Sequence, residues 1–208
     1  SGNWNGKQKG QIMSKFADIY GHEQIKEHLQ NAIRLNKVSH AYIFNGPMGS
    51  GKKMTAGIFA ETLQCERHGQ EPCGTCHSCI QSESGNQPDI IWVHHEKPGS
   101  IGVDDVREQV IGDMQIKPYS SRYKIYIIDE AEKLTQQAQN ALLKTIEEPP
   151  AYGIIILLTT NADTFLQTIL SRCVRLDFRP LRDTLVTQYL QEKYDLTDYE
   201  CRFATAFA

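Results

Sequence analysis

The 208-residue sequence contains no run of about 18 apolar residues, so it offers no candidate for a membrane-spanning helix. It also has no surplus of positive charge: the formal net charge is −3 at pH 7, whereas free-standing binders of naked DNA are usually basic. No N-terminal segment resembles a signal peptide, and we find no internal repeat or low-complexity segment. These absences predict a globular, cytoplasmic protein without membrane contact, and they leave DNA contact through one local face open.

A single hydroxyl group is missing from an otherwise complete nucleotide-binding motif. Residues 46–53 (GPMGSGKK) match the phosphate-binding pattern G-x-x-x-x-G-K-[ST] at every fixed position except the last. In that pattern backbone N–H groups cradle the phosphates, the lysine reaches the β- and γ-oxygens, and the hydroxyl binds Mg²⁺. Lys53 stands at the hydroxyl position, and its ammonium group has no lone pair for a cation. The pattern predicts an ATP or ADP site with incomplete Mg²⁺ coordination, lined by Gly46, Gly49, Gly51, Lys52 and Lys53.

Strand-like and helix-like segments alternate along the chain, which is typical of an α/β fold with a mainly parallel sheet. The apolar runs predict strands over residues 41–44, 90–93, 123–128, 154–158 and 174–178. Helical spacing of apolar residues predicts helices over residues 23–35, 52–63, 103–114, 135–148 and 166–170. The nucleotide-binding motif therefore lies between a strand and a helix, which is the context that its chemistry requires.

Breaks in composition divide the chain into three parts. Residues 1–12 are polar and rich in glycine, and we interpret them as an added leader that precedes a native start at Met13. Residues 13–180 form the predicted nucleotide-binding domain. Beyond Pro180 the pattern predicts helices over 183–194 and 198–207 with no strand between them, so residues 181–208 are expected to begin a second, helical domain that is cut short.

Polar residues follow two of the predicted strands. Asp129 and Glu130 end the third strand in the form of a Walker B motif, in which the first acid holds Mg²⁺ and the second polarises water. Carboxylates at the carboxyl end of a strand lie at the edge where α/β proteins bind ligands. Thr160 follows the fourth strand and is a candidate partner for a γ-phosphate or a water. The alternative for all three residues is ordinary capping of strands and helices.

Four of the six cysteines cluster in a short insert over residues 65–79. Two overlapping C-x₂-C steps let the backbone turn around one cation, and four thiolates favour tetrahedral zinc with a structural role. The alternatives are two disulfides or an iron–sulfur site, although such clusters in a reducing compartment more often bind metal. The predicted ligands are Cys65, Cys73, Cys76 and Cys79.

Taken together, these features resemble bacterial DNA polymerase III clamp-loader subunits of the AAA+ class over residues 13–208. The stretches that carry the resemblance are residues 16–22 (FADIYGH), 39–42 (SHAY), the cysteine insert, 140–150 (NALLKTIEEPP) and 169–173 (ILSRC). The resemblance implies a five-stranded parallel P-loop sheet, a three-helix lid that begins near Leu181, and a helical collar that this sequence lacks.

The resemblance also implies roles for single residues. Thr160 aligns with a nucleotide-sensing position, and Arg172 aligns with an arginine finger that reaches the ATP of a neighbouring subunit. Without that context, a lone arginine is usually a surface residue. The implied partners are other clamp-loader subunits, namely gamma/tau and delta, together with the sliding clamp and primed DNA.

Two departures from the gamma/tau pattern favour a delta-prime subunit. The motif ends in Lys52-Lys53 instead of Lys-Ser or Lys-Thr, and residues 90–95 (IIWVHH) replace a small-residue turn. The interpretation is a stator that helps to load the sliding clamp on primed DNA. It would be weak or inactive as an ATPase by itself, with Glu130 vestigial and Arg172 acting in trans.

Two alternatives remain open at this point. The first is an ATP-hydrolysing gamma/tau-like motor in which another group replaces the lost hydroxyl, which the intact Asp129-Glu130 pair motivates. The second is a zinc-based nucleic-acid-binding module with a vestigial P-loop, against which the acidic charge balance argues.

Overall fold

The computed structural model describes residues 15–95, 97–182, 184–187 and 191. The predicted leader over residues 1–12, most of the predicted helical segment after Pro180, and Cys201 lie outside the described residues. The three-part division of the chain therefore stays a prediction. Within the described ranges, no helix is both long and apolar enough to cross a membrane.

A five-stranded, fully parallel sheet forms the centre of the fold, in the order β2-β3-β4-β1-β5. The strands are β1 (Ala41–Asn45), β2 (Ile90–Trp92), β3 (Lys124–Ile128), β4 (Gly153–Thr159) and β5 (Val174–Asp177). The α/β class and the five parallel strands are thus confirmed, with strand ends within one or two residues of the prediction. Because β1 lies between β4 and β5, the loop that follows β1 emerges between the carboxyl ends of these two strands.

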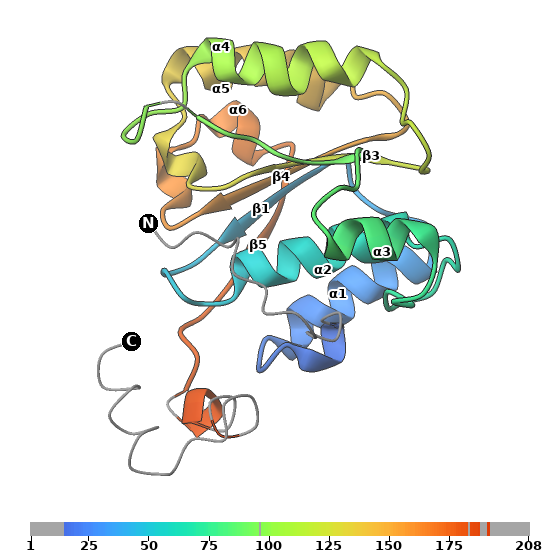
Figure 1. The fold of residues 1–208 in the computed structure, drawn as a ribbon. Coiled ribbons are helices and arrows are strands. Elements are labelled where there is room, and N and C mark those ends of the chain that lie inside the picture. Colours follow the sequence, from blue (N-terminus) through green and yellow to red (C-terminus); the bar gives the residue numbers. More distant parts are fainter. Residues whose placement is uncertain (1–14, 96, 183, 188–190, 192–208) are drawn as a thin grey trace.

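Helices cover both faces of the sheet (Figure 1). The helices α1, α2 and α3 lie on one side, and α4, α5 and α6 lie on the other. Their bounds are α1 (Glu23–Arg34), α2 (Lys52–Gln64), α3 (His77–Glu83), α4 (Val103–Val106), α5 (Gln136–Glu147) and α6 (Gln167–Leu170). Short 3-10 turns cover Phe16–Asp18, Asp113–Gln115, Ala131–Lys133 and Ala162–Thr164.

Successive strand residues point to opposite faces and build two separate cores. Ile43 packs into the core beneath α5, where it joins Leu142. Its neighbour Phe44 packs into the other core with Leu29 of α1 and Phe59 of α2. Each buried side chain of this size contributes roughly 2 kcal/mol through the removal of apolar surface from water. Burial on both faces explains why the central strands β1, β3 and β4 are nearly continuous apolar runs.

Two local elements differ from the sequence-based expectation. The helix predicted over 103–114 is regular only in α4 and continues as a π-helix over Arg107–Gly112. There the chain packs tightly, since a Cβ added to Gly112 would lie 3.1 Å from the carbonyl oxygen of Arg107. Helix α3 within the cysteine insert was not predicted, because its seven residues carry too few apolar positions to form a periodic pattern.

A buried carboxylate fixes the loop that precedes β3. Asp89 is 1% exposed and accepts backbone N–H groups from Tyr119, Ser120 and Ser121 at 2.7, 3.0 and 3.1 Å. Asp89→Ala leaves these donors without their acceptor, and we expect it to lower the free energy of unfolding by about 3 kcal/mol. Urea unfolding checks this value, with the exposed Asp104→Ala as the matched control. A loss no larger than that of the control would show that water replaces the carboxylate.

Candidate nucleotide and zinc sites

The P-loop connects β1 to α2, and its geometry requires its glycines. Gly49 and Gly51 have φ angles of 76° and 87°, a region that side chains with a Cβ rarely adopt. Gly46 has a different constraint, because an added Cβ would lie 2.5 Å from the carbonyl oxygen of Phe178. Lys52 is the first residue of α2, so the positive end of the helix dipole faces the loop. This arrangement fits the phosphates of a nucleotide.

Lys52 lies where the loop meets the acidic strand ends. Its Nζ donates hydrogen bonds to the carbonyl oxygens of Gly46 and Pro47, each at 2.6 Å. Burial lowers the pKa of Lys52, and the nearby carboxylates of Glu132 and Asp129 act in the opposite direction. A partly desolvated ammonium between the loop and two carboxylates is suited to a phosphate ligand, whose negative charge would stabilise its charged form.

Lys53 points toward the Walker B acid instead. Its Nζ lies 2.9 Å from Oδ2 of Asp129 and 5.4 Å from the ring centroid of Trp92 in β2. The residue that replaces the hydroxyl is therefore a cation paired with the carboxylate that would hold the metal. A divalent ion about 4 Å from this ammonium would meet repulsion on the order of 8 kcal/mol at an effective dielectric constant of about 20. The residues in this arrangement do not fit Mg²⁺.

The other predicted polar residues are held by neighbours that the sequence did not reveal. Glu130 has a φ of 51°, and its carboxylate lies 2.8 Å from Nζ of Lys133 and 3.7 Å from Nε2 of His95. Thr160 donates its hydroxyl to Oε1 of Glu132 at 2.8 Å and its N–H to Oε2 at 3.3 Å. These residues gather at the carboxyl ends of β3 and β4, next to the P-loop.

Two functional candidates were missed at the sequence level. For Glu132, the only signal in the sequence is its position two residues after Glu130. His22 contacts the P-loop through Nε2, which lies 2.9 Å from the carbonyl oxygen of Ser50, and burial lowers the pKa of this imidazole. His22 has a φ of 55° immediately before α1. The Gly21-His22 pair therefore indicates a turn at this position, but the sequence does not reveal that His22 contacts the P-loop.

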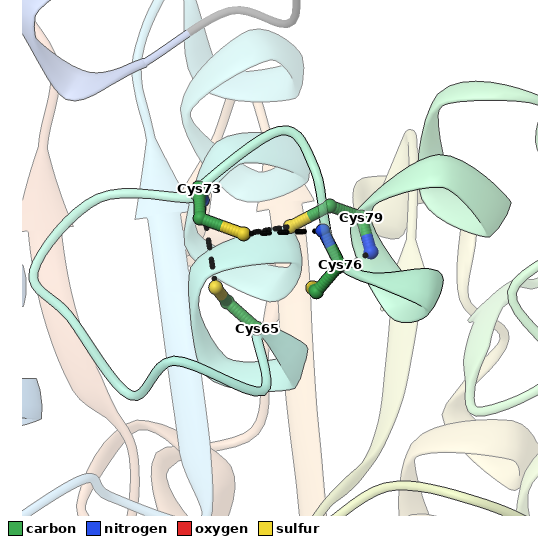
Figure 2. Close-up of side chains that lie close together, drawn as sticks. All are labelled: Cys65, Cys73, Cys76 and Cys79. Carbon is green, nitrogen blue, oxygen red and sulfur yellow. Dashed lines mark hydrogen bonds between the residues drawn. The ribbon is translucent and has the colours of Figure 1, made fainter.

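The four predicted metal ligands converge in space. Figure 2 shows Cys65 at the end of α2, Cys73 in the connecting loop, and Cys76 and Cys79 at the start of α3, with their sulfurs facing a common centre. All four sulfurs lie within 4.8 Å of one another, and those of Cys73 and Cys79 are 3.9 Å apart. Tetrahedral zinc with bonds of about 2.3 Å separates its sulfur ligands by about 3.8 Å. The cluster fits a structural zinc site.

Backbone N–H groups support this cluster. Cys76 donates its N–H to the sulfur of Cys73 at 3.3 Å, and Cys79 donates to that of Cys76 at 3.4 Å. Hydrogen bonds from the Thr75 backbone lower the pKa of Cys73 to about 5, whereas burial raises the pKa of Cys79. All cysteines in the described part of the chain are free thiols, which contradicts the disulfide alternative. His77 and His68 are exposed and do not belong to the ligand set.

Arg172 lies apart from this chain's own P-loop. It pairs with Glu147 at the end of α5, where Nη2 and Oε1 are 2.9 Å apart. Two residues later β5 begins with Val174, whose partner Tyr42 is near the start of β1. The P-loop follows the other end of β1, and a five-residue strand spans roughly 16 Å. Arg172 therefore lies at the opposite edge of the sheet from the nucleotide site of its own chain.

A parallel sheet of this order, with a P-loop after β1 and paired acids after β3, defines a P-loop protein of the AAA+ type. The chain belongs to the family whose model is described as DNA polymerase III, delta subunit, and which matches residues 21–182.

Among curated proteins, the chain is 40% identical over 182 residues to DNA polymerase III subunit tau of Bacillus subtilis, covering 87% of this chain and 32% of that protein. It is 41% identical over 177 residues to subunit tau/gamma of Haemophilus influenzae, covering 84% of this chain and 25% of that protein. The chain thus spans a third or less of the length of these relatives.

Solved structures agree on the fold. A gamma subunit-related protein of Thermotoga maritima matches with a TM-score of 0.63 at 24% identity, over 85% of this chain and 53% of that one. The RuvB branch migration motor of the same organism matches with a TM-score of 0.51 at 18% identity, over 83% of this chain and 50% of that one.

The prediction of a delta-prime subunit was wrong. The relatives are tau and gamma subunits at about 40% identity over most of the chain. The prediction rested on Lys53 and on residues 90–95, which are local departures. A single replaced side chain changes the chemistry of a site, but it does not outweigh the similarity to tau and gamma subunits that extends over most of the chain.

Proposed function

We propose that the chain is the AAA+ region of a gamma/tau-type subunit of a DNA polymerase III clamp loader, and that it binds ATP or ADP at its P-loop. The observation that carries this proposal is the convergence of Lys52 with Asp129 and Glu132 beside the P-loop, in a chain about 40% identical to tau. The partners would be other subunits of the holoenzyme, including delta, with the sliding clamp and primed DNA as the objects of the assembly.

The geometry supports a proposed role for each residue of the nucleotide site. The backbone of Gly46, Gly49 and Gly51 would cradle the phosphates, and Lys52 would move from the loop carbonyls to the β- and γ-oxygens. Asp129 and Glu130, which follow β3, would be the Walker B acids of this site. Thr160 would sense the nucleotide through the same hydroxyl that now bonds to Glu132.

Two further roles complete the proposal. Zinc bound by the four cysteines would have a structural role, because four protein ligands leave no open coordination position. Arg172 would act on the nucleotide of a neighbouring subunit, since the opposite edge of the sheet is too far from the P-loop of its own chain.

Lys52→Ala tests the nucleotide site. Losing charge-assisted hydrogen bonds worth about 2 kcal/mol should weaken ATP binding by roughly 30-fold. Isothermal calorimetry with the chain measures this change, and Lys144→Ala, an exposed lysine of α5, is the matched control. If the Lys52 variant and the control bind ATP with equal affinity, ATP does not bind at Lys52 and the proposed nucleotide site is wrong.

Assembly tests the assignment to a clamp loader. The chain in its full-length form should co-elute with the delta subunit and the remaining loader subunits of its own organism. Nucleotide binding without such co-elution would indicate a P-loop protein with a different function. That result would contradict the assignment to a clamp-loader subunit.

A further inference from the structure

The Lys53 ammonium is held in place by three elements of the fold. It extends from the first turn of α2, contacts the carboxylate at the end of β3 at 2.9 Å, and lies over the Trp92 ring of β2. A cation within about 6 Å of an aromatic ring centroid is attracted to the ring face. The side chains of Lys53 and Asp129 are 42% and 40% exposed, so the pair stays open to a ligand.

Lys52 and Lys53 contact different parts of the nucleotide site. Consecutive residues of a helix project about 100° apart, and here Lys52 turns to the loop carbonyls while Lys53 turns to the Walker B acid. The two ammonium groups therefore serve different parts of the site. An ammonium has three N–H donors, and Asp129 accepts one from Lys53, which leaves donors for phosphate oxygens.

We propose that Lys53 is a built-in cation that replaces the divalent metal, so that the chain binds nucleoside di- and triphosphates without Mg²⁺. This inference rests on the proposed nucleotide-binding function and specifies the form of its ligand. A cation joined covalently to the site does not have to be captured from solution, so it is present at every encounter with a nucleotide. Asp129 and Trp92 orient it, as a metal ligand set would orient an ion.

The residue at position 53 should determine how nucleotide affinity depends on Mg²⁺. With a serine or threonine at position 53, the carboxylate of Asp129 is free to hold a hydrated ion beside the phosphates. With lysine, metal and ammonium compete for one carboxylate. Added Mg²⁺ should therefore leave nucleotide affinity unchanged or weaken it, because the ion occupies phosphate oxygens that Lys53 would contact.

Calorimetric titration of ATP into the chain, with and without millimolar MgCl₂, tests the inference. The buffers are freed of metal by a chelating resin, because a dissolved chelator would also remove zinc from the cysteines. We expect the wild-type affinity without Mg²⁺ to equal or exceed that with Mg²⁺. Lys53→Thr restores the hydroxyl, and its affinity should rise about tenfold or more when Mg²⁺ is added.

A second variant guards against loss of fold. Lys53→Met keeps an unbranched side chain of nearly the same length and removes the charge, so its affinity without Mg²⁺ should fall about tenfold. Zinc content and thermal midpoint verify that both variants are folded. If wild-type binding strengthens tenfold with Mg²⁺, or if Lys53→Thr gains no metal dependence, the inference is wrong and the proposed function stands. If the wild type binds no nucleotide under either condition, the proposed function fails as well.

Discussion

Arg172→Ala, in every copy of this chain, should lower by about 10³-fold or more the rate at which a reconstituted clamp loader hydrolyses ATP at the site of the subunit next to Arg172. A guanidinium supplied by a neighbour stabilises the charge that develops on the γ-phosphate, and such fingers contribute roughly 10³–10⁵ in rate. Arg172 is 40% exposed and pairs with Glu147, and its Nη1 donates to the carbonyl oxygen of Thr168 and to Oγ of Ser171. Water can replace these surface contacts, so the side chain can leave them at small cost when a partner approaches. The measurement is steady-state phosphate release with primed DNA and sliding clamp present.

The control for this prediction is an arginine three residues further along. Arg175 has a similar exposure of 42% and pairs with Asp177 on β5. Arg175→Ala should leave the rate within about twofold, because a surface ion pair contributes little by itself. Nucleotide affinity of the Arg172 variant should match that of the wild type, since its own P-loop lies at the other sheet edge. An unchanged ATPase rate in Arg172→Ala would remove this residue from the proposed mechanism.

Cys79→Ser should abolish zinc binding and destabilise the chain by an amount on the order of 5 kcal/mol. Cys79 is 1% exposed and shares the sulfur cluster with Cys65, which is fully buried. Without zinc, the start of α3 loses its metal bridge to the end of α2. The described residues contain no second group of metal ligands that could replace this bridge. Zinc content by atomic spectroscopy and the urea midpoint measure the two effects.

Cys173→Ser provides the matched control for the zinc prediction. Burial alone raises the pKa of this lone thiol to about 12, so it is a neutral side chain outside the cluster. The control should keep its full zinc content and lose about 1 kcal/mol or less. Retention of zinc by Cys79→Ser would mean that three cysteines and another ligand suffice, which would overturn the four-thiolate assignment.

Local spacing determined much of this protein at the level of sequence. The apolar runs define the three central strands β1, β3 and β4, because a strand covered on both faces needs side chains that avoid water in nearly every position. The glycine spacing defines the P-loop, because its backbone angles exclude other residues. The C-x₂-C steps define the metal cluster, since neighbouring thiols are brought together by the turn that their own backbone makes.

Only the tertiary structure decided how distant parts of the chain meet. The ion pair of Lys53 with Asp129 joins α2 to the residue after β3, and the contact of Glu132 with Thr160 joins the 3-10 turn that follows β3 to the residue after β4. These pairings depend on the strand order β2-β3-β4-β1-β5, which is set by long-range packing that no local pattern encodes. The sequence showed that a hydroxyl was missing at position 53. Packing decided that the lysine there bonds to the metal-binding carboxylate, because β3 ends within reach of the first turn of α2.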